Sequence, residues 1–320
     1  MNISNEARRA AHALKVIARN EQIKEYIQHS EDLYPLLLKG AKRFVAGETR
    51  KEGIQKAEEL IQKGYQISVE YIGENTKTLE ECIEAKNECI ALTNELRQQQ
   101  KNVTISLDLS HIGLTLDPAL AVEHLQEIAK VAQIYGHTVM VSMEESQKTE
   151  EILEVYKTVT AQSPHVGITV QAHLHRTPED LADLLNYPGK IRLVKGAYQE
   201  SAEVAIPRSK ELNKRYFELV TTLIEANHPV SIATHDEELI QKIVESGYIH
   251  LPHVECEMLY GIRPDLIRSL KEQGAQAQVY VTYGSEWYLY LCHRIAEFPP
   301  NLYRLLSDII NPPEAESALY

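Results

Sequence analysis

The stretch VTISLDLSHIGLTLDPALAVEHLQEIAKVAQIYGHTVMVSME, residues 103–144, contains two short runs rich in β-branched residues and one long helical pattern. The runs are VTISLDL at 103–109 and TVMVSME at 138–144, and ALAVEHLQEIAKVAQIY at 119–135 lies between them. Apolar residues of this middle segment recur every three or four positions, which is typical of a helix that buries one face. The stretch therefore predicts two parallel strands joined by a helical crossover.

The same alternation extends along most of the chain. Six further strand-like runs are QISVEYIG at 66–73, GITVQAHL at 167–174, IRLVKGA at 191–197, VSIATHD at 230–236, HVECEML at 253–259 and AQVYVTYG at 277–284. Eight parallel strands with helical crossovers predict an α/β fold of the closed (β/α)8 TIM-like barrel type. An open dinucleotide-binding sheet would carry a GxGxxG turn after its first strand, and SVEYIGENTK lacks one.

The predicted division of the chain has three parts. We expect an N-terminal helical region at 1–62, the barrel as the catalytic domain at 63–308, and a tail at 309–320. The tail contains the Pro-led, acidic stretch NPPEAESALY at 311–320, which is expected to fray.

Composition restricts the class of function. With 320 residues, 43% of them hydrophobic, the chain can fill a large core, and its formal charge of −13 argues against nucleic-acid binding. The four cysteines show no CxxC pair or metal-ligand spacing, which predicts reduced thiols, a cytoplasmic protein and no metal site. No signal peptide or membrane span is evident. The basic opening with Arg8, Arg9, Lys15 and Arg19 is read as a solvated helix face that could also touch the inner face of the membrane.

In a barrel of this kind, chemistry takes place at the carboxyl ends of the strands. Polar residues expected to converge on that mouth are Glu70, Glu74, Asp108, Ser142, Glu144, Gln171, His173, Arg192, Lys195, Thr234, His235, Glu255, Glu257 and Tyr280. About half of them should be structural, because a buried charge without a partner is costly.

The segment IRLVKGAYQE at 191–200 contains two cationic residues, and a glycine follows the second of them. Arg192 and Lys195 are three residues apart, so on a strand they project to opposite faces and only one can enter the mouth. Lys195 can be a surface lysine or the partner of a neighbouring carboxylate, and a Schiff-base lyase that uses Lys195 is a third, subordinate hypothesis. The small residues Gly196 and Ala197 would let a planar ligand approach the backbone.

The last helical pattern, in YGSEWYLYLCHRIAE at 283–297, places Trp287, Tyr290, Leu291 and Arg294 on one face. An aromatic stripe at this spacing is usually core. Arg294 among aromatic residues needs either a carboxylate partner, for which Glu297 is available, or a ligand anion. Spacing leaves both readings open.

Four blocks, RLVKGAYQES, ATHD, EMLYGIRPD and VYVTYGSEWYLYLCHRIAE, resemble the proline dehydrogenases, especially the monofunctional bacterial enzymes. The resemblance runs from about residue 43 to about residue 305. It implies a distorted (β/α)8 barrel that holds non-covalent FAD, with the final helix over the flavin. The cofactor positions that it implies are Gln171, Arg192, Val194, Gly196, Ala197, Thr234 and His235. The substrate-pocket positions that it implies are Tyr280, Tyr290, Arg294 and Glu297.

Departures from the family pattern gather on the substrate side. Asp108 replaces a lysine beside the reacting amine, Ser142 replaces its aspartate partner, and His293 replaces one arginine of a doublet whose gate partner matches Glu74. Further departures are Glu257 for glutamine, His173 for tyrosine and Thr282 for proline. The first three changes and Glu257 together make the pocket formally more negative, so we expect it to bind a carboxylate poorly.

The resulting hypothesis is an FAD-dependent oxidoreductase that oxidises the C–N bond of proline, or of a related cyclic or secondary amine, by hydride transfer to the flavin. A quinone or another carrier would accept the electrons. Asp108 would hold the ammonium group or act as a base. The alternative hypothesis is a non-catalytic or repurposed relative that binds a ligand or a partner.

Overall fold

The structure is a computed structural model of the 320-residue chain. It describes residues 9, 13–14, 16–17, 20–98, 103–298, 301–310 and 320, without the side chains of Glu21 and Glu297. The basic opening, and with it the expected contact with a membrane, lies almost wholly outside the described residues. No helix among the described residues is long and apolar enough to cross a bilayer.

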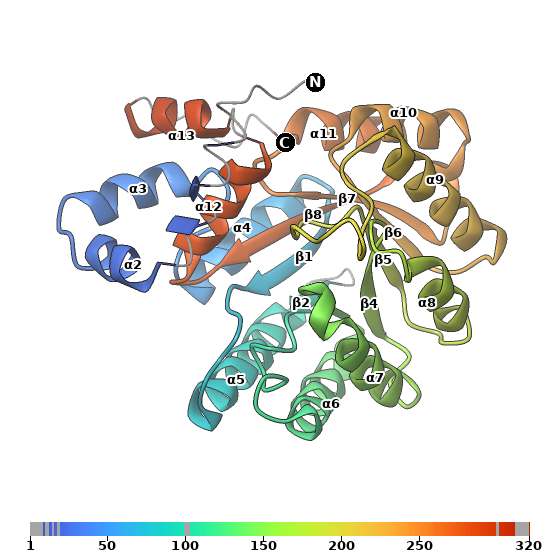
Figure 1. The fold of residues 1–320 in the computed structure, drawn as a ribbon, viewed down its shortest axis with the longest axis horizontal. Helices are drawn as coiled ribbons and strands as arrows, with labels where there is room; N and C mark the ends of the chain where they lie inside the picture. Colours follow the sequence, from blue (N-terminus) through green and yellow to red (C-terminus); the bar gives the residue numbers. More distant parts are fainter. Residues whose placement is uncertain are drawn as a thin grey trace.

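A closed barrel of parallel strands forms the centre of the molecule (Figure 1). Its strands are β1 (Gln66–Tyr71), β2 (Thr104–Leu107), β3 (Thr138–Val141), β4 (Val166–Gln171), β5 (Ile191–Val194), β6 (Val230–Ala233), β7 (Val254–Leu259) and β8 (Gln276–Tyr283). They pair in sequence order, and β8 closes the barrel on β1 over Gln66–Tyr71. The predicted (β/α)8 fold and all eight predicted strands are confirmed.

Helices follow most of the strands and cover the outside of the barrel (Figure 1). Those of the barrel are α5 (Leu79–Glu95), α6 (Pro118–Ile134), α7 (Thr149–Thr160), α8 (Thr177–Leu184), α9 (Lys210–Glu225), α10 (Glu237–Glu245) and α11 (Pro264–Glu272). Their starts follow from local chemistry. Thr78 forms a capping box with Glu81 at α5, and Asp117 caps α6, which begins with Pro118.

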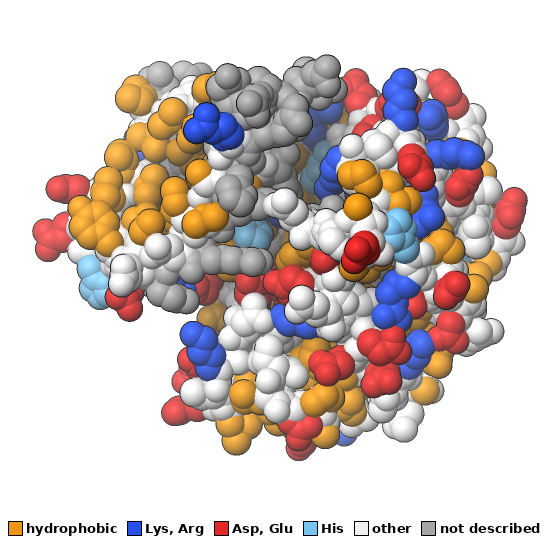
Figure 2. Space-filling view, in the orientation of Figure 1, with side chains coloured by type: hydrophobic (Ala, Val, Ile, Leu, Met, Phe, Trp, Pro, Cys, Tyr) orange, Lys and Arg blue, Asp and Glu red, His pale blue; other side chains and the backbone are white. Residues whose placement is uncertain are grey.

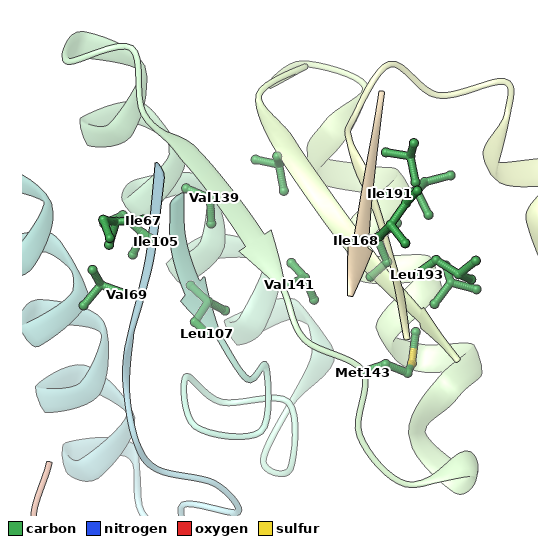
Figure 3. Packing of buried hydrophobic residues seen from close by; sticks show 14 of the residues in the cluster. Ile67, Val69, Ile105, Leu107, Val139, Val141, Met143, Ile168, Ile191 and Leu193 are labelled. Atoms are coloured by element: carbon green, nitrogen blue, oxygen red, sulfur yellow. The ribbon is translucent and has the colours of Figure 1, made fainter. Parts of the chain in front are cut away.

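Strand residues alternate between an apolar outer layer and a polar interior. Ile67, Val69, Ile105 and Leu107 belong to a continuous core with the covering helices (Figure 3). The intervening Ser68 and Ser106 point the other way, and their hydroxyl oxygens are 2.8 Å apart across the interior. The barrel therefore buries apolar surface outside its sheet and places polar groups inside it.

A second apolar cluster joins the two ends of the chain. It combines Phe44 and Val45 with Trp287, Leu291 and Leu305. The helices that contribute are α2 (Glu21–Gln28), α3 (Leu33–Ala41), α12 (Trp287–Glu297) and α13 (Asn301–Ile310). Figure 2 shows apolar side chains gathered over α2 and α3, while charged residues of both signs are scattered over the barrel.

Helix α4 (Arg50–Gln62) packs beside β8 and β1, the position that the helix after β8 would take in a regular barrel. Helix α12, which follows β8, lies at the end of the barrel instead. Two backbone hydrogen bonds fix the junction, from Ala46 N to Thr282 O at 2.8 Å and from Gly284 N to Gly47 O at 3.0 Å. Gly53 of α4 lies against Tyr283, where a Cβ atom would be 2.6 Å from the ring. Helix α4, which precedes β1, thus covers the outside of the barrel where β8 meets β1.

Candidate active site

Carboxyl groups gather where β1, β2 and β3 end. Asp108 directly follows β2 and is half-buried. Burial, and after it the nearby Glu70 and Glu144, raise the pKa of Asp108 well above its ordinary value, while a hydrogen bond with Ser142 opposes this shift. Glu144 is fully buried and paired with Lys148, Nζ to Oε2 2.6 Å. Asp108 therefore favours its neutral form, and Glu144 is already neutralised.

Tyr280 of β8 connects this acidic group to the interior. Its hydroxyl donates a hydrogen bond to Glu70, and burial raises the pKa of both groups. The guanidinium carbon of Arg192 lies 4.8 Å from the centre of the Tyr280 ring. Tyr280 thus lies between a carboxyl group at the mouth and a cation below it.

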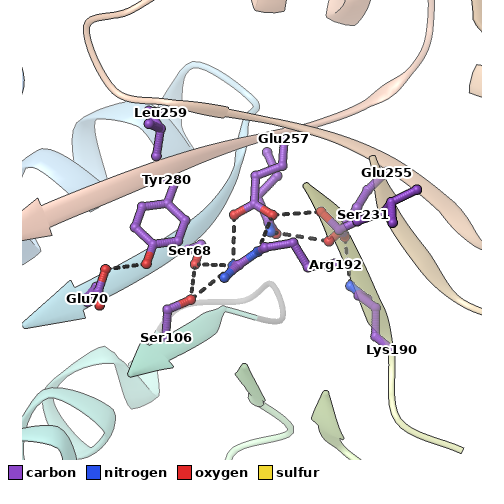
Figure 4. Close-up of polar contacts among 12 residues, drawn as sticks. Ser68, Glu70, Ser106, Lys190, Arg192, Ser231, Glu255, Glu257, Leu259 and Tyr280 are labelled. Atoms are coloured by element: carbon purple, nitrogen blue, oxygen red, sulfur yellow. Dashed lines mark hydrogen bonds and ion pairs between the residues drawn. The ribbon is translucent and has the colours of Figure 1, made fainter. Parts of the chain in front are cut away.

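Arg192 lies inside the barrel in a polar network (Figure 4). Its Nε is 2.7 Å from Glu257 Oε2 and its Nη2 is 2.8 Å from Glu257 Oε1. Nη2 also lies 3.0 Å from Ser68 Oγ and 2.9 Å from Ser106 Oγ. Glu257 is 2% exposed, so its charge and that of Arg192 offset each other away from water.

This network corrects two expectations. Glu257 does not add negative charge to a substrate pocket, because Arg192 neutralises it. Glu255 does not lie at the mouth: it is the second residue of β7 and pairs with Lys190, just before β5 starts, at 2.7 Å. Both glutamates were misplaced because the sequence does not state how deep in the barrel a strand residue lies.

Gly196, just after the end of β5, lies where there is no room for a side chain. Its φ is +106°, and a Cβ atom there would lie 2.4 Å from the His173 ring, so only glycine fits. Val194 is half-buried and Ala197 is exposed. The backbone at Gly196–Ala197 is thus open on the Ala197 side and in contact with an imidazole at Gly196.

Gln171, the last residue of β4, carries a buried acceptor without a partner. Its Nε2 donates to Glu144 O at 2.7 Å, but no described residue bonds its Oε1. Such an orphan costs about 1–3 kcal/mol, which a bound ligand with a donor could recover.

Thr234 and His235 follow β6 at the same end of the barrel. Thr234 is buried, and its hydroxyl accepts a hydrogen bond from Asp236 N at 3.2 Å. His235 Nε2 accepts from Leu259 N at 3.0 Å, so the ring bridges β6 and β7. Burial, then the charge of Arg294, lower the pKa of His235 to about 3.

Helix α12 brings its polar residues to the mouth. Arg294 lies with its guanidinium carbon 4.9 Å from the centre of the Tyr290 ring. Its charge acts on both Glu70 of β1 and His235 after β6, which places it across the barrel end. His293 is half-buried beside it. The side chain of Glu297 lies outside the described residues, so its expected pairing with Arg294 stays a prediction.

Two residues singled out in the sequence have structural roles. Trp287 is fully buried, and its indole N–H donates to Tyr34 OH at 3.1 Å. Lys195 turns outward, where Asp236 pairs with it and Asn213 Oδ1 accepts from it at 2.6 Å. Lys195 is therefore the partner of a neighbouring carboxylate, as one of the two interpretations expected.

One mouth residue was missed from the sequence. Tyr198 is half-buried, and burial, followed by Asp108 and Glu74, raises its pKa well above the ordinary value. The residue stands in the motif KGAY directly after Ala197, and that position was the available signal.

Comparison with known proteins shows the family of the chain. The family model described as proline dehydrogenase matches residues 53–298. The chain belongs to the proline dehydrogenase family. A proline dehydrogenase 1 of Bacillus subtilis is 34% identical over 274 residues, covering 85% of this chain and 91% of that protein. A proline dehydrogenase of Deinococcus radiodurans is 33% identical over 269 residues, covering 82% and 87% respectively.

A solved structure supports the fold of this proline dehydrogenase family member. Proline utilization A from Bdellovibrio bacteriovorus, inactivated by N-propargylglycine, matches with a TM-score of 0.78 at 17% identity. The match covers 97% of this chain and 39% of that chain. The predicted resemblance is thus confirmed, and family membership makes the chain an oxidoreductase of the flavoenzyme class.

The positions at which the resemblance implied departures from the family pattern lie at different depths in the barrel. Asp108, Ser142 and His293 stand at the mouth, whereas Glu257 lies in the interior with Arg192. Thr282 is fully buried in β8, and no described residue bonds its hydroxyl. These positions therefore do not form one charged pocket.

Proposed function

We propose that this protein is an FAD-dependent oxidoreductase that oxidises the C–N bond of proline or of a related cyclic or secondary amine. A quinone or another carrier would then take the electrons. Family membership supports the reaction class, and the carboxyl groups around Asp108 support an amine substrate. The observation that carries the proposal is the meeting of Asp108, Glu70, Tyr280 and Arg294 at one barrel end.

The residues at the ends of β4, β5 and β6 fit an FAD. The orphan Oε1 of Gln171 requires a donor, and Ala197 is exposed next to Gly196, whose Cβ position is filled by the His173 ring. The hydrogen bonds of Arg192 to Glu257, Ser68 and Ser106 use its Nε and Nη2 and not its Nη1. Gln171, Arg192, Val194, Gly196, Ala197, Thr234 and His235 would hold the cofactor. When bound, FAD supplies the acceptor for the hydride that leaves the amine.

Charge at the mouth favours an amine over an amino acid. Arg294 remains as a carboxylate partner, but the lysine expected at position 108 is an aspartate. Loss of one ion pair at about 4 Å is worth about 4 kcal/mol at an effective dielectric near 20, or about a thousandfold in affinity. The neutral form of Asp108 lessens repulsion but restores no attraction.

The test compares L-proline with pyrrolidine, which has the same ring without the carboxylate. Under anaerobic conditions we expect pyrrolidine to bleach the bound flavin at least as fast as L-proline. The double variant Asp108→Lys with Ser142→Asp should raise the bleaching rate with L-proline about a hundredfold. In this variant L-proline should bleach the flavin faster than pyrrolidine does. Fast bleaching of the unaltered protein by L-proline, with no gain in the double variant, would contradict the altered substrate.

A second candidate function is a non-catalytic relative. The replacement of a lysine and aspartate pair by Asp108 and Ser142 favours it, because both members of one working pair are gone. Colourless purified protein that takes up no added FAD would support this candidate. Yellow protein whose flavin an amine reduces would eliminate it.

A further inference from the structure

His173 has a backbone held on both sides. It lies two residues beyond the end of β4, and its N–H donates to Lys195 O at 3.0 Å. Its carbonyl accepts from Ile206 N at 2.8 Å. These bonds fix the imidazole relative to the end of β5, where a cofactor would meet the backbone.

The ring of His173 rests directly on Gly196. The nearest atoms to a Cβ built on Gly196 are ring atoms Cε1 and Nδ1, both at 2.4 Å. Arg208 Nη2 donates to Gly196 O at 2.7 Å, so the glycine is fixed as well. The imidazole therefore forms part of the surface beside Gly196–Ala197.

The His173 side chain has a buried polar atom that lacks a hydrogen-bond partner among the described residues. His173 is 5% exposed, yet no described residue bonds its Nε2. Gln171, the last residue of β4 and two residues earlier in the chain, also has an orphan polar atom, Oε1. Two unsatisfied buried polar atoms at one strand end point to a ligand with polar groups along one edge.

We propose that His173 is a cofactor-binding residue, in which Nε2 hydrogen-bonds the polar edge of the heteroaromatic ring system that Gln171 also contacts. The inference rests on the proposed function, because FAD is that ligand. Burial, then the charge of Arg208, lower the pKa of His173 to about 4, so the ring is neutral at ordinary pH. A neutral imidazole can donate or accept at Nε2 according to its tautomer.

The test uses the full chain and measures the dissociation constant of FAD from the quenching of its fluorescence. His173→Phe keeps a flat ring on Gly196 but removes the nitrogens, and should weaken FAD binding on the order of tenfold. His173→Gln keeps a donor and an acceptor, and should lose less. Thermal melting of each variant without FAD shows whether it folds.

His137 offers a matched control. It also has a buried Nε2 without a described partner, but it directly precedes β3 at the opposite end of the barrel. His137→Phe should bind FAD like the unaltered protein. The proposal fails if His173→Phe binds FAD within twofold of the unaltered protein, or if His137→Phe weakens binding equally. Absence of FAD binding by the unaltered protein would overturn the proposed function as well.

Discussion

At the scale of single residues, the pair of Arg192 and Glu257 decides how charge is distributed in the barrel. Both side chains are almost completely buried, and each satisfies the other. Most barrels of this class fill their interior with layers of branched apolar residues. Here one level is an ion pair with three serines, Ser68, Ser106 and Ser231, around it.

Removal of the Glu257 carboxylate should lower the stability of the protein strongly. Glu257→Ala leaves Arg192 as an unpaired buried charge, and we expect a loss of about 3–5 kcal/mol in the free energy of unfolding. Glu257→Gln keeps an acceptor and should cost less. Urea denaturation measures both, and Glu238→Ala, which breaks the exposed pair with Lys242, is the control with a cost of about 0.5 kcal/mol or less. A loss under about 1 kcal/mol for Glu257→Ala would refute the argument.

Asp108 should make stability fall as pH rises. Its pKa in the folded protein is raised well above the ordinary value near 4, so the folded state binds the proton more tightly than the unfolded state. Stability is then lost from about pH 4 up to the raised pKa, by up to about 1.4 kcal/mol per pH unit.

Asp108→Asn removes this contribution. Denaturation at pH 5 and pH 8 should show a smaller loss across that interval for Asp108→Asn than for the unaltered protein. Asp32→Asn, at an exposed position, should behave like the unaltered protein. Parallel losses in the Asp108→Asn variant and the unaltered protein would show that Asp108 does not hold its proton.

Sequence reasoning located residues along the chain better than it located them in depth. It placed Asp108, Gln171 and Gly196 at the barrel end, because strand periodicity fixes which residue ends an element. It could not tell that Arg192 meets Glu257, since the two are 65 residues apart and their contact depends on the barrel register.

At the scale of elements, the fit of α4 against β8 depends on the absence of one methyl group. Gly53 lies inside the helix, where alanine would normally be favoured by about 1 kcal/mol. The added Cβ would lie 2.6 Å from the ring of Tyr283, whose hydroxyl is bonded to Glu88 at 2.8 Å. Crowding should therefore outweigh propensity.

We expect Gly53→Ala to destabilise the protein by about 1–3 kcal/mol. Chemical denaturation gives the value, and Gln55→Ala on the exposed side of α4 should stay within about 0.5 kcal/mol of the unaltered protein. A stabilised Gly53→Ala variant would mean that Tyr283 moves aside without cost.

All eight strands were predictable because each is a short β-branched run between helical patterns. The position of α4 was not predictable. Its sequence indicates only an N-terminal helical region and carries no signal that the helix packs against β8 and β1. Likewise α12 was predicted as a helix, but its place at the barrel end came only from the family resemblance.

At the scale of the whole molecule, FAD should act as a stabiliser. A ligand that binds only the folded state at 100 times its dissociation constant adds about 2.7 kcal/mol to the free energy of unfolding. We expect a matching rise in melting temperature when FAD is added, and none with NAD at the same concentration. Equal effects of the two nucleotides would mean that the site does not select a flavin.

The junction of the two chain ends constrains how the protein is made. Tyr34 and Trp287 bond across 253 residues, and α4 is synthesised long before the strand β8 on which it rests. Until translation reaches β8, the apolar side of the early helices has no native surface to cover it. Newly made chains stalled before that strand should be the species that chaperones hold and proteases remove.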